Sequence, residues 1–219
     1  MCGIVGYVGT SEACPFLMEG LRRLEYRGYD SSGVAIHSGR SVEVTRSVGR
    51  IDALAGRLEA APLSGSLGIG HTRWATHGPA TEPNAHPHLG GDGEVVLVHN
   101  GVIENFQTLK NELVEKGYSF RSETDSEVIA HLLSENLKKS PEITGKPNVR
   151  YLNAVQMTLG RLQGTYGLAI SFVDKPNLMI TARFGSPLVI GVGQGEYFVS
   201  SDASPLAGRT EQIVYLTDH

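Results

Sequence analysis

The order of the strand-like and helix-like segments limits the folds that this chain can adopt. Apolar runs typical of strands lie near both ends of the sequence, and segments with one apolar helical face lie between them. Strands are expected at residues 2–9, 67–71 and 94–100, and five more between residues 166 and 216. Each sheet buries a face against another layer, so this order favours an α+β domain with two packed sheets flanked by helices.

The remaining elements follow from periodicity and from turn residues. Apolar residues recur at helical spacing in five segments, residues 11–24, 51–58, 105–116, 124–137 and 154–162. A hairpin is expected from residues 33–37 and 42–47 around Ser38-Gly39-Arg40. Thr124 and Glu127 have the spacing of a capping box at a helix start. Residues 72–93 show neither period, which predicts a lid or binding loop.

Composition narrows the functional classes. The 219 residues are 40% hydrophobic and contain no linker, which predicts one domain over residues 1–219. The net charge of -4 comes from 19 basic and 23 acidic residues without long runs, so neither nucleic acid nor a membrane surface is an expected partner. The chain has no leader or bilayer-crossing stretch and two cysteines, Cys2 and Cys14, which favours the reducing cytoplasm without a disulfide.

Cys2 follows the initiator methionine, so removal of Met1 would leave a thiol and a free α-amine on one residue. An N-terminal amine, with a usual pKa of about 7.7–8.0, can act as the base that activates its own nucleophile. The alternative is that Cys2 is a small buried residue at the start of an apolar strand. Position alone does not decide between the two interpretations.

Three further blocks accompany Cys2. They are Tyr26-Arg27-Gly28-Tyr29-Asp30-Ser31, then His71-Thr72-Arg73-Trp74-Ala75-Thr76-His77-Gly78 with Asn84-Ala85-His86-Pro87-His88, and His99-Asn100-Gly101-Val102-Ile103-Glu104-Asn105. Together with Cys2 they resemble, over essentially the whole chain, the glutaminase domain of the glutamine:fructose-6-phosphate amidotransferase family. That family belongs to the N-terminal nucleophile amidotransferases. The resemblance implies a four-layer αββα sandwich of the N-terminal nucleophile hydrolase type.

The resemblance also implies a reaction. Cys2 would attack the side-chain amide of L-glutamine, releasing ammonia and forming a glutamyl thioester that water hydrolyses to glutamate. Asn100 and the backbone N–H of Gly101 would form the oxyanion hole, where one donor is typically worth about 2.7–4 kcal/mol in the transition state. Asn-Gly is also a common hairpin turn, which is the alternative interpretation of this pair.

Further residues of the site follow from the same resemblance. Arg73 would bind the α-carboxylate of glutamine. The alternative interpretation is that Arg73 forms a surface ion pair. Asp125 would bind the α-ammonium group, or else stabilise a helix N-terminus. Substrate contacts are also expected from the remaining loop residues, Trp74, Thr76 and His77. Trp74 resembles a gate for ammonia, although a lone Trp is more often part of the core.

Supporting roles are expected for Arg27 and His86. Arg27 resembles an arginine that holds the nucleophile region together, and a helix-capping role is its alternative. Five of the eight histidines fall within residues 67–101, but they lack the ligand pattern of a zinc site, so we expect neither metal nor cofactor.

Alternatives remain within and outside the family. A related amidotransferase, such as that of the purine pathway, would share the chemistry, and retention of Met1 would favour a non-catalytic glutamine-binding module. Full-length family members continue into two sugar-isomerase domains that bind fructose 6-phosphate, and they are expected to be homo-oligomers. The sequence ends at His219 without those domains, so we expect an excised glutaminase domain.

Overall fold

The computed structural model describes residues 2–39 and 41–218 of the chain. One antiparallel sheet contains seven strands, β1 (Gly3–Val8), β2 (Ser31–Ser38), β3 (Ser41–Val48), β4 (Leu67–Arg73), β9 (Val189–Val192), β10 (Tyr197–Ser200) and β11 (Gln212–Tyr215). Their spatial order is β11-β9-β10-β1-β4-β2-β3. The first strand of the chain therefore lies in the middle of this sheet, paired with β10 on one side and with β4 on the other.

The second sheet contains four antiparallel strands, β5 (His88–Gly90), β6 (Val95–Ile103), β7 (Gly164–Phe172) and β8 (Lys175–Phe184). They lie in the order of the sequence, β5-β6-β7-β8. Between the sheets a shared apolar layer contains Ile4 and Ile69 from the larger sheet and Val96, Val98 and Ala169 from the smaller one. The two sheets thus pack face to face around a common core.

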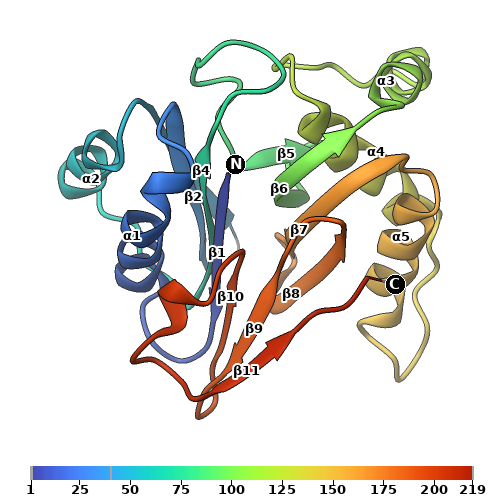
Figure 1. Cartoon of the computed structure of the whole chain (residues 1–219). Coiled ribbons are helices and arrows are strands. Elements are labelled where there is room, and N and C mark those ends of the chain that lie inside the picture. The colour runs from blue at the N-terminus through green and yellow to red at the C-terminus, as the bar shows by residue number, and fades with distance from the viewer. Residues whose placement is uncertain (1, 40, 219) are drawn as a thin grey trace.

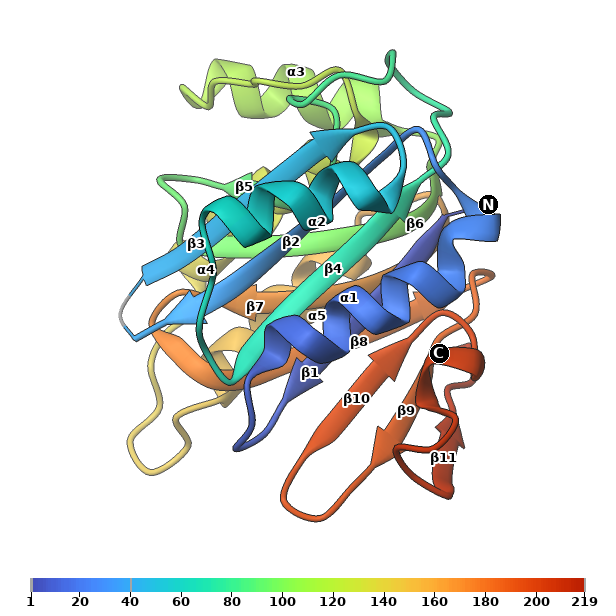
Figure 2. The ribbon, with the colours of Figure 1, turned by 90° about the vertical axis from the view of Figure 1, so that its left-hand side faces the viewer.

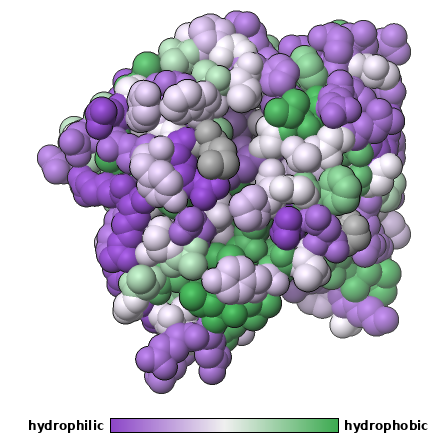
Figure 3. All heavy atoms as spheres, viewed as in Figure 1, coloured by the Kyte–Doolittle hydropathy of each residue, from purple (hydrophilic) through white to green (hydrophobic). Residues whose placement is uncertain are grey.

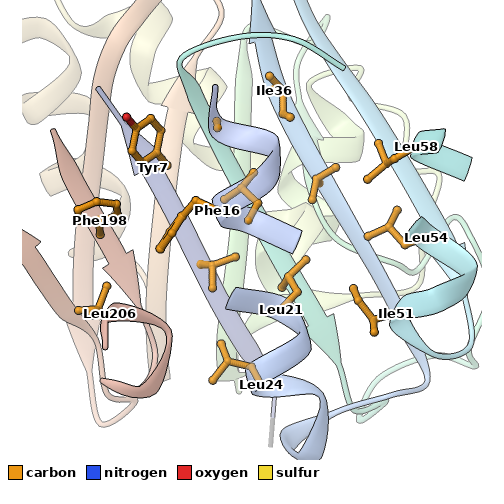
Figure 4. Packing of buried hydrophobic residues seen from close by; sticks show 14 of the residues in the cluster. Tyr7, Phe16, Leu21, Leu24, Ile36, Ile51, Leu54, Leu58, Phe198 and Leu206 are labelled. Atoms are coloured by element: carbon orange, nitrogen blue, oxygen red, sulfur yellow. The ribbon is translucent and has the colours of Figure 1, made fainter. Parts of the chain in front are cut away.

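Helices cover the outer face of each sheet (Figures 1 and 2). The larger sheet carries α1 (Ala13–Leu24) and α2 (Ile51–Ala60), and the smaller carries α4 (Asp125–Lys139) and α5 (Val149–Leu159). Another helix, α3 (Phe106–Glu115), packs against α4. Figure 4 shows how Leu21 and Phe16 of α1 and Leu54 of α2 fill the space over the larger sheet. This arrangement confirms the expected α+β fold and its four layers.

Two expectations about local structure are wrong in part. Residues 72–93 are not structureless, because Thr72 and Arg73 extend β4 and residues 88–90 form β5. Three residues are too few to show an alternating pattern in the sequence. The capping box is half formed: Thr124 Oγ1 accepts from the Glu127 N–H at 3.3 Å, but the Glu127 carboxylate accepts from the N–H groups of Arg121 and Ser122.

The longest helix in the described part of the chain, α4, has 15 residues. No helix there combines the length and apolarity needed to cross a bilayer. Figure 3 shows mostly hydrophilic and intermediate atoms on the face seen in Figure 1, with apolar atoms gathered in its lower half.

The tip of the hairpin between β2 and β3 includes Arg40, which lies outside the described residues, while its two strands are confirmed.

Candidate active site

Cys2 lies directly before β1, at the end of the sheet where β4 finishes. The antiparallel register pairs Gly3 with Thr72, so the residues after β4 are brought beside Cys2. The Trp74 N–H donates to Cys2 Sγ at 3.2 Å, and the thiol lies 3.5 Å from the Trp74 carbonyl oxygen. The thiol is therefore held where the ends of two neighbouring strands of the larger sheet, β1 and β4, meet.

The smaller sheet supplies Asn100 and Gly101 from β6. Asn100 Nδ2 donates to the Cys2 carbonyl oxygen at 3.1 Å, which joins the two sheets at Cys2. Gly101 has a φ of +133°, and a Cβ there would lie 2.1 Å from the Thr165 carbonyl oxygen, so this position requires glycine. Because β6 continues to Ile103, the Asn-Gly pair lies within a strand and is not a hairpin turn.

A small cavity of about 20 Å³ gathers most of the predicted site residues. It is lined by Cys2, Arg73, Trp74, Thr76, His77, His86, His99, Gly101, Thr124, Asp125 and Ser126. A larger cavity of about 890 Å³ lies between β3, α2 and the segment joining α3 to α4, and its lining does not include Cys2. We assign the candidate site to the smaller cavity because its lining combines the Cys2 thiol with the opposite charges of Arg73 and Asp125, whereas volume alone identifies no chemistry.

Arg73 is buried and its guanidinium binds the loop that follows β4. It donates to the carbonyl oxygens of Pro79 and Gly78, each at 3.1 Å, and to that of His77. Burial lowers the pKa of Arg73, against the opposing influence of the nearby Cys2 and Asp30. Arg73 forms no ion pair within the described residues, so its interpretation as a surface ion pair is wrong.

Asp125 is the first residue of α4 and is 4% exposed. Its Oδ2 accepts from the Ile103 N–H at 2.9 Å, which ties the helix start to the end of β6. The carboxylate lines the cavity and also lies in the first turn of the helix, where a negative charge is favourable. Both interpretations of Asp125 are therefore compatible with its position.

Arg27 and Trp74 both form hydrogen bonds with Cys2. Arg27 Nε donates to the Cys2 carbonyl oxygen at 3.2 Å, and its Nη1 pairs with Asp202 at 3.3 Å. Trp74 is 45% exposed and its ring makes an edge contact with Tyr29, with 5.5 Å between the ring centroids. Trp74 is therefore not a core residue, contrary to the usual role of a lone tryptophan.

The loop residues Thr76 and His77 reach the same cavity. The His77 ring makes an edge contact with Phe106 of α3 at 5.2 Å between centroids, whereas Thr76 is exposed. Two carboxylates that were not predicted from the sequence support this region. Asp202 pairs with Arg27, and Asp30 accepts from the Ala75 N–H at 2.7 Å. Asp30 stands inside one of the quoted blocks, but Asp202 lies far along the chain with no local signal.

Burial dominates the electrostatics of the site. It raises the pKa of the Cys2 thiol, opposed by the hydrogen bond from the Trp74 N–H and by the charge of Arg73. Burial also lowers the pKa of His71 to about 3 and that of His86 well below its usual range, so both imidazoles are neutral near pH 7. Within the described residues no group of three or more His, Cys, Asp or Glu side chains is placed to hold a metal ion.

Lowering the pH from near 7 to near 5 is expected to reduce the free energy of unfolding. Burial lowers the pKa of His37 to about 4 and those of His71 and His88 to about 3, from 6.5. Below about pH 6.5 the unfolded chain binds protons that the folded chain does not, so this stability is complete above that pH and is lost as the pH falls towards the folded-state values. Each histidine contributes a slope of up to about 1.4 kcal/mol per pH unit.

Urea denaturation of the wild type and of His37→Leu, repeated across this pH range, measures the effect. His37 has no hydrogen-bond partner for either ring nitrogen among the described residues, so the substitution removes one titrating group and no side-chain hydrogen bond known there. The free energy of unfolding is expected to change less steeply with pH in the variant, because unfolding of the variant takes up one proton fewer. Equal slopes would show that His37 does not titrate differently in the two states.

Comparisons with known proteins were made for the sequence and for the fold. A family model for a glutamine amidotransferase domain matches residues 71–208. Glutamine–fructose-6-phosphate aminotransferase (isomerizing) from Pyrococcus horikoshii is 49% identical over 218 residues, which cover 100% of this chain and 35% of that protein. The protein of the same name from Zymomonas mobilis is 50% identical over 221 residues, covering 100% of this chain and 34% of that protein. The chain thus spans about a third of the length of these relatives.

Solved structures agree with the fold. Glutamine phosphoribosylpyrophosphate amidotransferase from B. subtilis, complexed with ADP and GMP, superposes with a TM-score of 0.78 at 27% identity, covering 98% of this chain and 44% of that one. A structure described as the allosteric regulatory enzyme of purine biosynthesis gives a TM-score of 0.79 at 28% identity, with the same coverage of 98% and 44%. The N-terminal nucleophile hydrolase type of fold is confirmed. Because the family model also covers most of the sequence, this chain belongs to the glutamine amidotransferase domain family.

Proposed function

We propose that this domain hydrolyses the side-chain amide of L-glutamine to glutamate and ammonia, with Cys2 as the nucleophile. The observation that carries the proposal is the composition of the small cavity, which contains a thiol, a guanidinium and a carboxylate. An amino acid carries a carboxylate and an ammonium group, so Arg73 and Asp125 offer the two complementary charges. The thiol then has a defined target, the amide carbon of the side chain.

The chemical steps balance without a cofactor. A base takes the thiol proton, and Cys2 sulfur attacks the amide carbon to give a tetrahedral oxyanion. The oxyanion collapses, the carbon–nitrogen bond breaks, and the base returns its proton to the leaving nitrogen, which departs as ammonia. Water then adds to the thioester, glutamate leaves, and the thiol is restored. The proposed base is the α-amine of Cys2 after removal of Met1, a residue that lies outside the described part of the chain.

Asn100 and Gly101 are the proposed oxyanion donors. Asn100 Nδ2 uses one N–H for the Cys2 carbonyl oxygen, which leaves its second N–H for the oxyanion. The Gly101 N–H follows on the same strand, next to the nucleophile. Neutral donors that are fixed before the reaction stabilise charge as it develops and need no reorganisation.

The loop after β4 is the proposed substrate cover, formed by Trp74, Thr76 and His77. In this structure the cavity of about 20 Å³ has room for about one water, so we infer that the loop moves aside when glutamine enters. In this structure the guanidinium N–H groups of Arg73 donate to carbonyl oxygens of the loop. A substrate carboxylate would compete for those donors and form a bidentate, charge-assisted pair. Arg27 and His86 are proposed supporting residues, and Trp74 a gate for ammonia.

The whole protein is proposed to deliver this ammonia to fructose 6-phosphate, in the biosynthesis of hexosamines. Identities of 49% and 50% to two glutamine–fructose-6-phosphate aminotransferases support this choice over the purine-pathway amidotransferase, whose structural relative is 27% identical. Fructose 6-phosphate would bind outside this chain, and the complete protein is proposed to be a homo-oligomer. A cytoplasmic location is supported by the free state of both cysteines, Cys2 and Cys14.

The test is an intact-mass measurement combined with an assay of glutamate release on the same sample of this domain. Loss of the Met1 mass together with hydrolysis of glutamine to glutamate and free ammonia is the expected result. A sample without Met1 that binds glutamine but does not hydrolyse it would favour the non-catalytic module. Full activity with Met1 retained would refute the free amine as the base.

A further inference from the structure

We propose that His71 is a positioning residue, which fixes the orientation of the Asn100 side-chain amide so that one N–H binds the Cys2 carbonyl oxygen and the other is available to the oxyanion. This inference rests on the proposed function, because it concerns the same oxyanion site. His71 lies on β4 of the larger sheet, and its side chain reaches across to β6 of the smaller sheet. Its side-chain hydrogen bonds among the described residues go to Asn100 Oδ1 and to the His99 carbonyl oxygen, so it is placed to act through Asn100 and not on glutamine.

The hydrogen bonds of His71 define its protonated nitrogen. His71 Nε2 lies 3.0 Å from Asn100 Oδ1 and 3.1 Å from the His99 carbonyl oxygen. A backbone carbonyl oxygen only accepts hydrogen bonds, so Nε2 must carry the proton. The atom of Asn100 that faces the same N–H must then be its oxygen.

The other end of the Asn100 amide gives the same assignment independently. Its nitrogen lies 3.1 Å from the Cys2 carbonyl oxygen, which also only accepts. A rotated amide would place oxygen against oxygen at Cys2 and N–H against N–H at His71. Both hydrogen bonds would be lost within a buried site, where Asn100 is 7% exposed, so His71 and Cys2 together hold one orientation.

The environment of His71 keeps a single tautomer available. The ring is 0% exposed and stacks on His86, with 4.0 Å between the centroids. Its Nδ1 is buried and has no hydrogen-bond partner among the described residues, so no group there competes for the proton on Nε2. A neutral imidazole with one N–H can orient Asn100 without adding a charge to the site.

Three variants of the domain test this role, with kcat and KM for glutamine hydrolysis and thermal stability measured for each. In His71→Leu the donor is removed and the volume kept, and in His71→Gln an amide N–H replaces Nε2–H. His37→Leu is the matched control, since His37 is another buried histidine, placed at the far end of β2. We expect His71→Leu to lower kcat about 10- to 100-fold with little change in KM, less than the roughly 100- to 1,000-fold loss from deleting an oxyanion donor.

His71→Gln is expected to recover most of the activity, and His37→Leu to keep wild-type kcat. Combining His71→Leu with Asn100→Ala makes the test specific, because a residue that acts through Asn100 adds no loss once Asn100 is absent. Multiplied losses in the double variant, or an unchanged kcat in a folded His71→Leu, would overturn the inference while leaving the proposed function intact. A wild type without glutamine hydrolysis would instead refute the proposed function, and this inference with it.

Discussion

Replacing Cys2 by alanine is expected to reduce glutamine hydrolysis by at least about 10⁴-fold, because without the nucleophile only binding and oxyanion stabilisation remain. The fold should persist, since the hydrogen bonds of the Cys2 thiol among the described residues are both with the Trp74 backbone. Glutamate release and thermal unfolding of the same preparation measure the two effects separately. Glutamine should still stabilise the variant if Arg73 and Asp125 bind its two charges.

The control for this prediction is the second cysteine. Cys14 is partly buried in α1 and packs against the core over the larger sheet, away from the cavity. Cys14→Ala should therefore keep kcat within a few-fold of the wild type. Substantial turnover by Cys2→Ala, or equal losses in the two variants, would mean that the nucleophile is misassigned.

Replacing Asn100 by alanine is expected to lower kcat by about 10²- to 10³-fold, the usual effect of removing one oxyanion donor. KM should change little, because the oxyanion exists in the transition state and not in bound glutamine. Steady-state kinetics separate the two parameters. The loss includes any shift of Cys2, whose carbonyl oxygen also loses the bond from Asn100 Nδ2.

Asn111→Ala supplies the comparison for that experiment. Asn111 is an exposed residue of α3, where its side chain accepts from Gln107 at 2.9 Å. Its removal should alter neither kcat nor KM. An Asn100→Ala enzyme with a raised KM and an unchanged kcat would place Asn100 in substrate binding and remove it from the oxyanion hole.

The fold was predictable where local pattern and tertiary packing agree. Apolar residues at helical spacing placed α1 and α4 correctly to within a few residues, and the glycines of the first strand predicted close backbone approach. The structure shows the reason at Gly6, where a Cβ would lie 2.9 Å from Met179 Sδ of the opposite sheet. The strand β5 was missed because its three residues, 88–90, are held by pairing with β6 and not by their own pattern.

The site was predictable only through motifs that stand close together in the sequence. Arg73, Trp74 and His77 share one block, so the resemblance located them at once. Asp202 and Arg27 form an ion pair although they are 175 residues apart in the sequence, and no local sequence pattern predicts such a contact. The role proposed for His71 was likewise hidden, because the block contains the residue but only the packing of β4 on β6 places it beside Asn100.

The proposed nucleophile and the proposed oxyanion donors belong to different layers of the sandwich. Cys2 is anchored to β1 of the larger sheet and Asn100 to β6 of the smaller one, with a single apolar layer between the sheets. A misplacement of about 1 Å between reacting groups can cost roughly 10²-fold in rate. The rate of glutamine hydrolysis therefore depends on how precisely the apolar layer between the two sheets positions Cys2 relative to Asn100. A substitution at Ile69 or Val98 that lets one sheet slide over the other would slow the reaction while every catalytic side chain is still present.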